Sequence, residues 1–243
     1  MKTNIFHKHY RPFIFLLGAL LFAISIVTLT NSNIFLYRLL RGFICFVFLI
    51  LILLFQKKDS NPLLLAFLGF YGASSILTIW YENNLMAIMS MGLNVLSFIV
   101  LIRALFPKIS FIKINSFLII SFAVMILING FLSYQFIIMF KGMTLSNTHF
   151  IFVVLNTFGI VLVSFMGLLY NHKYSTKSSL IFVGFILLLL FSEVFRGIAY
   201  YEMAYGDYSA HIARGLLILS IALLMHYSFL KKNDDELLNS RFF

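Results

Sequence analysis

The chain is poor in charged residues, cysteine and proline. Charged residues make up only 11% of its 243 residues, whereas about a quarter of a soluble domain is charged. The single cysteine, Cys45, excludes an internal disulfide and argues against a cysteine-based metal site. The three prolines are too few to interrupt many helices. From this composition we expect neither a metal ion nor a cofactor.

Apolar sequence is what the chain has in abundance. Hydrophobic residues make up 62% of it, thirty residues are Phe, and the mean hydropathy is +1.01. The apolar runs are continuous, whereas the strands of a membrane β-barrel alternate polar and apolar residues. Only helices and closed barrels satisfy the backbone within a bilayer. The sequence therefore predicts an all-α polytopic membrane protein.

Eight apolar runs can be marked, each near the roughly 20 residues that cross a bilayer. We expect one transmembrane domain over residues 1–243, with spans at approximately 13–29, 34–55, 62–81, 85–106, 116–140, 149–170, 178–201 and 210–230. The first run resembles a signal peptide, but no small-residue cleavage site ends it, so we count it as a helix. Two pairs of small residues, Ala19/Ala23 and Gly69/Ala73, have the spacing that allows close helix approach.

The net charge of +10 comes from basic residues in the short connections between spans, which is typical of membrane topology and does not indicate a nucleic-acid partner. Thirteen of the eighteen basic residues fall on one side of the predicted bundle: Lys2, Lys8, Arg11, Lys57, Lys58, Arg103, Lys108, Lys113, Lys173, Lys177, Lys231, Lys232 and Arg241. Because cytoplasmic connections carry the excess of Lys and Arg, both termini are predicted to be cytoplasmic. The composition, rich in Ile, Phe, Asn and Lys, favours a bacterial inner membrane.

Polar residues within the spans are the candidates for function, because a charged side chain at bilayer depth costs at least a few kcal/mol and usually has a partner or a cavity. Glu193 is the only acidic residue well inside a span. Arg196 follows it on the same helix face, and Arg214 lies at similar depth on the eighth span. A Glu193–Arg214 ion pair is therefore geometrically reasonable. The other candidates at comparable depth are Arg38, Arg41, Ser74, Ser75, Asn94 and His211.

Two interpretations of these polar residues stay open. A cavity facing the extracytoplasmic leaflet, with more positive than negative charge, would suit the phosphate or carboxylate of an amphiphile. Alternatively, the charged residues form a structural ion-pair network, Arg38 and Arg41 extend to lipid phosphates, and the serines and Asn94 make ordinary interhelical hydrogen bonds. His149 has no evident role. The motifs of zinc proteases, serine hydrolases and nucleotide-binding loops are absent from the sequence.

The order of spans and short motifs resembles the YhhN/lysoplasmalogenase family of eight-helix membrane proteins. The residues that carry the resemblance are Arg38 and Arg41 in the second span, Gly72-Ala73-Ser74-Ser75 in the third, Gly92-Leu93 with Ser97-Phe98 in the fourth, and Ser192-Glu193 in the seventh. The resemblance implies a lipid pocket and hydrolysis of the vinyl-ether bond of lysoplasmalogens by acidic residues of the third and seventh helices.

The sequence departs from that family pattern at the acidic residues. Ser74 or Ser75 stands where the family has a third-helix Asp, and only Glu193 keeps a carboxylate. Vinyl-ether hydrolysis needs a proton donor and help in activating water, and arginines beside Glu193 would hold it as the anion. We therefore expect a lysolipid-binding protein, with Glu193 as the catalytic residue if it is an enzyme. A non-catalytic subunit with a protein partner or a second copy, and a small-solute transporter, are the alternatives.

Overall fold

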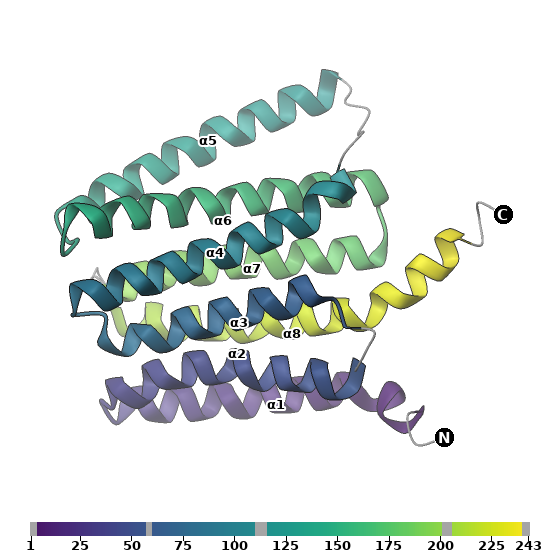
Figure 1. Cartoon of the computed structure of the whole chain (residues 1–243), viewed down its shortest axis with the longest axis horizontal. Coiled ribbons are helices and arrows are strands. Elements are labelled where there is room, and N and C mark those ends of the chain that lie inside the picture. The colour runs from purple at the N-terminus through teal and green to yellow at the C-terminus, as the bar shows by residue number, and fades with distance from the viewer. Residues whose placement is uncertain (1–3, 57–59, 110–115, 201–205, 240–243) are drawn as a thin grey trace.

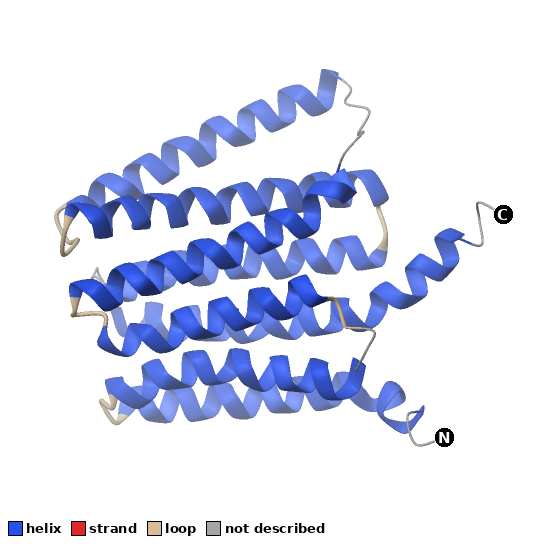
Figure 2. Cartoon of the chain, viewed as in Figure 1, coloured by secondary structure: helices blue, strands red, loops and turns tan. Residues whose placement is uncertain are grey.

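The computed structural model describes residues 4–56, 60–109, 116–200 and 206–239, and its described residues form helices joined by short turns, with no strand among them (Figure 2). The elements are α1 (Asn4–Thr30), α2 (Ile34–Gln56), α3 (Pro62–Leu77), the short 3-10 helix η2 (Thr78–Trp80), α4 (Asn84–Ile109), α5 (Ser116–Lys141), α6 (Asn147–Tyr174), α7 (Lys177–Tyr200) and α8 (Gly206–Asn239). Helix starts follow local sequence signals. Asn61 caps α3 by accepting from the Leu63 amide, and Ser146 caps α6 by accepting from the His149 amide.

Each of the eight α-helices contains a stretch long and apolar enough to cross a membrane. This confirms the predicted all-α architecture of about eight spans and makes the chain a multi-pass membrane protein. The helices extend past the predicted spans most clearly in α1, which begins at Asn4, and in α8, which continues to Asn239. The predicted spans counted only apolar residues, whereas a helix can continue through polar sequence once its backbone leaves the hydrocarbon.

Six of the helices form a closed ring. Going around it, α2 packs on α3, α3 on α4, α4 on α6, α6 on α7, α7 on α8, and α8 on α2 (Figure 1). We call this set the helix ring. Helix α1 lies outside it against α2 and α8, and α5 lies outside it against α6. The two helices outside the ring are therefore peripheral, and the ring encloses the polar side chains described below.

Glycines allow the closest approach between α2 and α3. A Cβ atom added at Gly42 would lie 2.4 Å from Ile76 Cγ1 and 3.0 Å from the Gly72 carbonyl oxygen. The two small-residue pairs in which the sequence suggested close helix approach do not bring helices this close together. Ala19 and Ala23 are exposed, and a Cβ at Gly69 would meet only Leu49 at 3.9 Å. Close packing in membranes depends on small residues at the interface, and the interface here is the Gly42 face of α2.

The beginning of α1 and the end of α8 lie at the same end of the bundle (Figure 1). We call the opposite end, where α2, α4, α6 and α8 begin, the distal end. Several residues behind the predicted orientation lie outside the described residues, namely Lys2, Lys57, Lys58, Lys113 and Arg241, and the side chains of Lys8, Arg11, Lys231 and Lys232 are likewise not described. Cytoplasmic termini therefore stay a prediction.

Candidate functional site: a polar cavity inside the helix ring

Three charged residues from three helices lie at nearly the same level in the ring. Arg41 follows the first residue of α2 by seven positions, and Glu193 precedes the last residue of α7 by seven, so each lies about 10 Å from the distal end along its helix. Arg214 lies eight positions into α8, about 12 Å along it. All three residues are buried. Such burial of charge in a membrane helix requires partners or a polar cavity.

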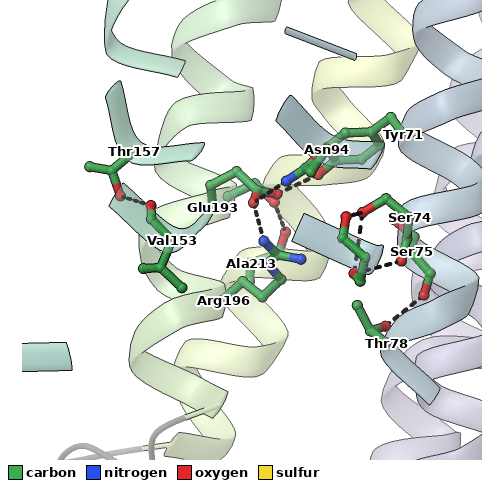
Figure 3. A network of polar contacts seen from close by, with 12 residues as sticks. Tyr71, Ser74, Ser75, Thr78, Asn94, Val153, Thr157, Glu193, Arg196 and Ala213 are labelled. Carbon is green, nitrogen blue, oxygen red and sulfur yellow. Dashed lines mark hydrogen bonds and ion pairs between the residues drawn. The ribbon is translucent and has the colours of Figure 1, made fainter. Parts of the chain in front are cut away.

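Glu193 is the centre of a hydrogen-bond network from four helices, and Figure 3 shows Tyr71, Asn94 and Arg196 around its carboxylate. Its Oε1 atom accepts from Arg41 Nη2 at 2.5 Å and from the Tyr71 hydroxyl at 2.5 Å. Its Oε2 atom accepts from Asn94 Nδ2 at 3.3 Å and from Arg196 on the same helix. The two carboxylate oxygens thus accept four hydrogen bonds in total, and two of the four come from guanidinium groups. Such pairing stabilises a buried carboxylate as the anion.

Arg41 is held from α3 as well as from α7. Its Nη2 donates to the Tyr71 hydroxyl at 2.6 Å, and its Nε donates to Ser75 Oγ at 3.3 Å. The close approach at Gly42 brings α2 near enough to α3 for these contacts. Arg41 therefore points into the ring and does not extend to lipid phosphates, contrary to that alternative interpretation.

Arg214 does not form the ion pair with Glu193 that the sequence made reasonable. Its Nη2 donates to the Tyr37 carbonyl at 2.6 Å, and its guanidinium lies over the Tyr37 ring, 4.2 Å from the centroid. Its Nη1 is buried without a hydrogen-bond partner among the described residues. The predicted pairing was wrong because Arg41 and Arg196 occupy both oxygens of Glu193.

The remaining predicted residues divide between the site and its surroundings. Asn94 and Ser75 belong to the Glu193–Arg41 network. Ser74 lies outside that network, because its hydroxyl donates to the Ser90 carbonyl at 2.7 Å while the Ser90 hydroxyl returns a bond to Ser74. This reciprocal pair joins α3 to α4, as expected of ordinary interhelical hydrogen bonding. His211 is half-buried and is not among the described residues that line the cavity.

A cavity of about 600 Å³ lies within the helix ring and extends to the distal end. Its charged lining consists of four arginines and two acidic residues: Arg38, Arg41, Arg196, Arg214, Glu193 and Asp207. The buried side chain of Asn156 also lines it, and the Asn156 Oδ1 atom has no partner within the described part of the chain. Arg214 and Asn156 both line the cavity, and each carries one buried polar atom, a donor and an acceptor respectively, that is unpartnered among the described residues. Buried polar atoms are rarely left unsatisfied in native proteins, so this pair suggests a bound polar group.

At the rim of the cavity, Arg38 is paired with a carboxylate at the protein surface. Its Nη1 donates to Glu82 Oε1 at 2.7 Å, and its guanidinium lies 5.6 Å from the centroid of the Tyr200 ring. His149, for which the sequence indicates no role, packs against Tyr81, which lines the cavity. It is buried, its Nδ1 accepts from the Leu145 amide, and its Nε2 is 2.9 Å from the Tyr81 hydroxyl.

Sequence reasoning missed Tyr71 and Asn156. Tyr71 lies one helical turn before Ser75, so it shares a face with a residue that was selected. Asn156 is a polar side chain in the middle of the sixth span, and that position alone could have indicated it. Tyr37 contributes through its backbone carbonyl and its ring, and no sequence pattern indicates such a contact.

No group of three or more His, Cys, Asp or Glu side chains within the described residues could hold a metal ion. The charged lining of the cavity is thus made of arginines and two acidic residues. In comparisons with models of protein families, with curated proteins and with solved structures, nothing matches the chain.

Proposed function

We propose that this protein binds a lysolipid or a similar amphiphile with an anionic headgroup in the cavity of the helix ring. The observation that carries the proposal is Arg214, a buried guanidinium with an unpartnered Nη1 at the cavity wall. The ion pairs found among the described residues use Arg38, Arg41 and Arg196, and none uses Arg214. A phosphate or carboxylate is the group that a free guanidinium binds best.

The proposal includes an orientation and a location. With both termini in the cytoplasm of a bacterial inner membrane, the distal end faces the extracytoplasmic side, and Arg214 lies about 12 Å inward from that end along α8. A lipid headgroup could then reach the cavity from the outer leaflet. The excess of Lys and Arg in the connections at the other end supports this orientation.

Hydrolysis of the vinyl-ether bond, which the YhhN resemblance implies, is the second candidate function. The observation that favours it is that the Glu193 carboxylate lines the same cavity as Arg214. Against it stand the four donors that hold both Glu193 oxygens, because a carboxylate paired in this way is a poor proton donor to an enol ether. The geometry thus favours binding over turnover.

Native mass spectrometry of the purified full chain tests the binding proposal. We expect wild type to retain a lysolipid, and Arg214→Met to retain it roughly ten- to a hundredfold less, since a hydrogen bond to a charged group contributes about 1.5–3 kcal/mol. Arg103→Met is the matched control, because Arg103 is exposed on α4 far from the cavity. Equal retention by Arg214→Met and wild type would overturn the proposal.

The same preparation distinguishes the alternatives. If wild type retains no lipid and a protein copurifies in fixed stoichiometry, the charged network belongs to a membrane subunit. Release of aldehyde from lysoplasmalogen by wild type, lost in Glu193→Gln, would establish the hydrolase. Without aldehyde release from wild type, the hydrolase candidate is rejected and binding alone remains.

A further inference from the structure

The polar cavity shares a wall with a second cavity outside the helix ring. The second cavity has a volume of about 780 Å³ and lies between α5, α6 and α7. Thr157 and Ile160 of α6, and Leu190 and Val194 of α7, line both cavities. These four side chains are therefore the partition between the interior of the ring and the space beneath α5. We call them the seam residues.

The second cavity has the lining expected of a site for hydrocarbon. Its lining, as far as the structure describes it, contains no charged side chain and consists mainly of Met, Leu, Ile, Val and Phe. Helix α5 covers it from outside and diverges from α6 along its length (Figure 1). Most described side chains of α5 are exposed, so this helix faces lipid on the other side. The cavity thus adjoins both the lipid phase and the polar site.

Helices α6 and α7 are in close contact on one side of the seam residues. A Cβ added at Gly167 would lie 2.7 Å from Ile186 Cδ1, so the two helices approach closely near their connecting turn. One to three turns toward the distal end, the seam residues separate one cavity from the other. The Thr157 hydroxyl donates to the Val153 carbonyl at 2.9 Å (Figure 3) and is therefore satisfied within α6. The partition consequently needs no polar partner from a ligand.

We infer that the hydrocarbon chain of an amphiphile bound at Arg214 leaves the helix ring between α6 and α7 and lies in the cavity beneath α5. This inference rests on the proposed function. A headgroup inside a closed ring requires an apolar exit for its chain. The other weakly packed junction of the ring, between α2 and α8, is covered by α1. The seam residues are the place where the polar cavity adjoins an apolar space of suitable character.

The position of Asn156 specifies the ligand further. Asn156 precedes the seam residue Thr157, and its buried Oδ1 lacks a partner among the described residues. A ligand that extends from Arg214 to the seam places its middle portion beside this acceptor. A free hydroxyl between the headgroup and the chain would satisfy it. The ligand class is therefore a single-chain lipid that carries an anionic headgroup and a free hydroxyl, as a lysophospholipid does.

Photocrosslinking tests where the chain lies. The probe is palmitoyl lysophosphatidic acid with a diazirine at the far end of its chain, bound to the full chain in lipid nanodiscs. Location is measured rather than affinity, because a hydrocarbon chain gains little by moving from lipid to an apolar protein surface. We expect adducts on peptides that contain Ile138, Leu168 and Leu187, which line the second cavity.

Two variants separate the inference from other outcomes. Val194→Trp fills the seam and should abolish most of these adducts, whereas Ile151→Trp, on an exposed face of α6, should leave them unchanged. Arg214-dependent retention with adducts on α1 and α2, or spread over all lipid-facing helices, would overturn the inference and leave the proposed function intact. Absence of lipid retention in wild type would overturn both.

The role of Asn156 has a separate readout. Asn156→Leu should lower retention of palmitoyl lysophosphatidic acid severalfold but leave retention of its analogue without the free hydroxyl unchanged. A purely structural role would lower the retention of both lipids equally, and that result would remove the hydroxyl from the inferred ligand.

Discussion

Arg41 on α2 and Glu193 on α7 are 152 residues apart in the sequence, and their Nη2 and Oε1 atoms lie 2.5 Å apart inside the helix ring. Both side chains are more than nine-tenths buried. The contact joins two helices that have α8 between them in the ring, and it fixes the rotation of each helix about its axis. The same contact occupies the Glu193 carboxylate, which vinyl-ether hydrolysis by this protein would require.

Removal of one partner from this network should strongly destabilise the fold. Glu193→Leu leaves Arg41 and Arg196 without their carboxylate, and breaking a buried pair in this way costs about 3–5 kcal/mol. The free energy of unfolding in detergent micelles measures the loss. Glu82→Gln is the control, because Glu82 is largely exposed and its pair with Arg38 should contribute about 0–1 kcal/mol.

The double variant Arg41→Met/Glu193→Leu checks the interpretation of that loss. It removes both charges of the pair, so it should be more stable than Glu193→Leu alone. Additive losses in the double variant would mean that the two residues act independently, contrary to the contact described.

Arg214→Met should stabilise the protein while lowering its lipid retention roughly ten- to a hundredfold. Arg214 is buried, and its Nη1 has no partner among the described residues. Replacement by an apolar side chain of similar length removes a desolvated cation and loses one hydrogen bond to Tyr37. We expect a gain of about 1 kcal/mol in the free energy of unfolding. Binding residues often carry such a stability penalty.

The purely structural interpretation of the charged cluster makes the opposite prediction for Arg214→Met. If Arg214 only fixes helix register, the variant unfolds more readily than wild type. Thermal unfolding of both proteins in the same detergent, without added lipid, distinguishes the two interpretations.

Gly42→Ala should separate α2 from α3. The new methyl group would meet Ile76 and the Gly72 carbonyl, and overpacking of this kind costs about 1–3 kcal/mol. Because the same interface places Arg41 against Tyr71 and Ser75, lipid retention should fall together with stability. Gly130→Ala on α5 is the control, since nothing lies within 4 Å of the added Cβ there. Equal stability of the two variants would show that the close approach at Gly42 is unimportant.

The predicted orientation places the distal end outside the cytoplasm. A reporter that is active only in the periplasm should be silent when fused after Phe243 and active when inserted at Leu145, in the turn between α5 and α6. Activity of the fusion after Phe243 would reverse the orientation and with it the leaflet assigned to the cavity.

Eight spans and the depth of each charged residue could be predicted from the sequence alone. Hydropathy is a local property, and a constant rise per residue converts sequence position into depth along a helix. For this reason Glu193, Arg41 and Arg214 were correctly expected at one level. Their partners could not be predicted, because a helix that is apolar on nearly every side gives no signal for which face turns inward.

Only the tertiary structure decided which charges meet. Close packing at Gly42 sets the rotation of α2, and this rotation lets Arg41 form the ion pair with Glu193. Arg214 contacts Tyr37 and lines the cavity instead. Ser74 and Ser75 are adjacent in sequence, yet Ser74 hydrogen-bonds to α4 whereas Ser75 accepts a hydrogen bond from Arg41. The reason is that neighbouring residues point about 100° apart on a helix. The sequence by itself determined that this is a multi-pass helical protein with charge at one depth. The packing of its helices determined that one of those charges, Arg214, forms no ion pair among the described residues.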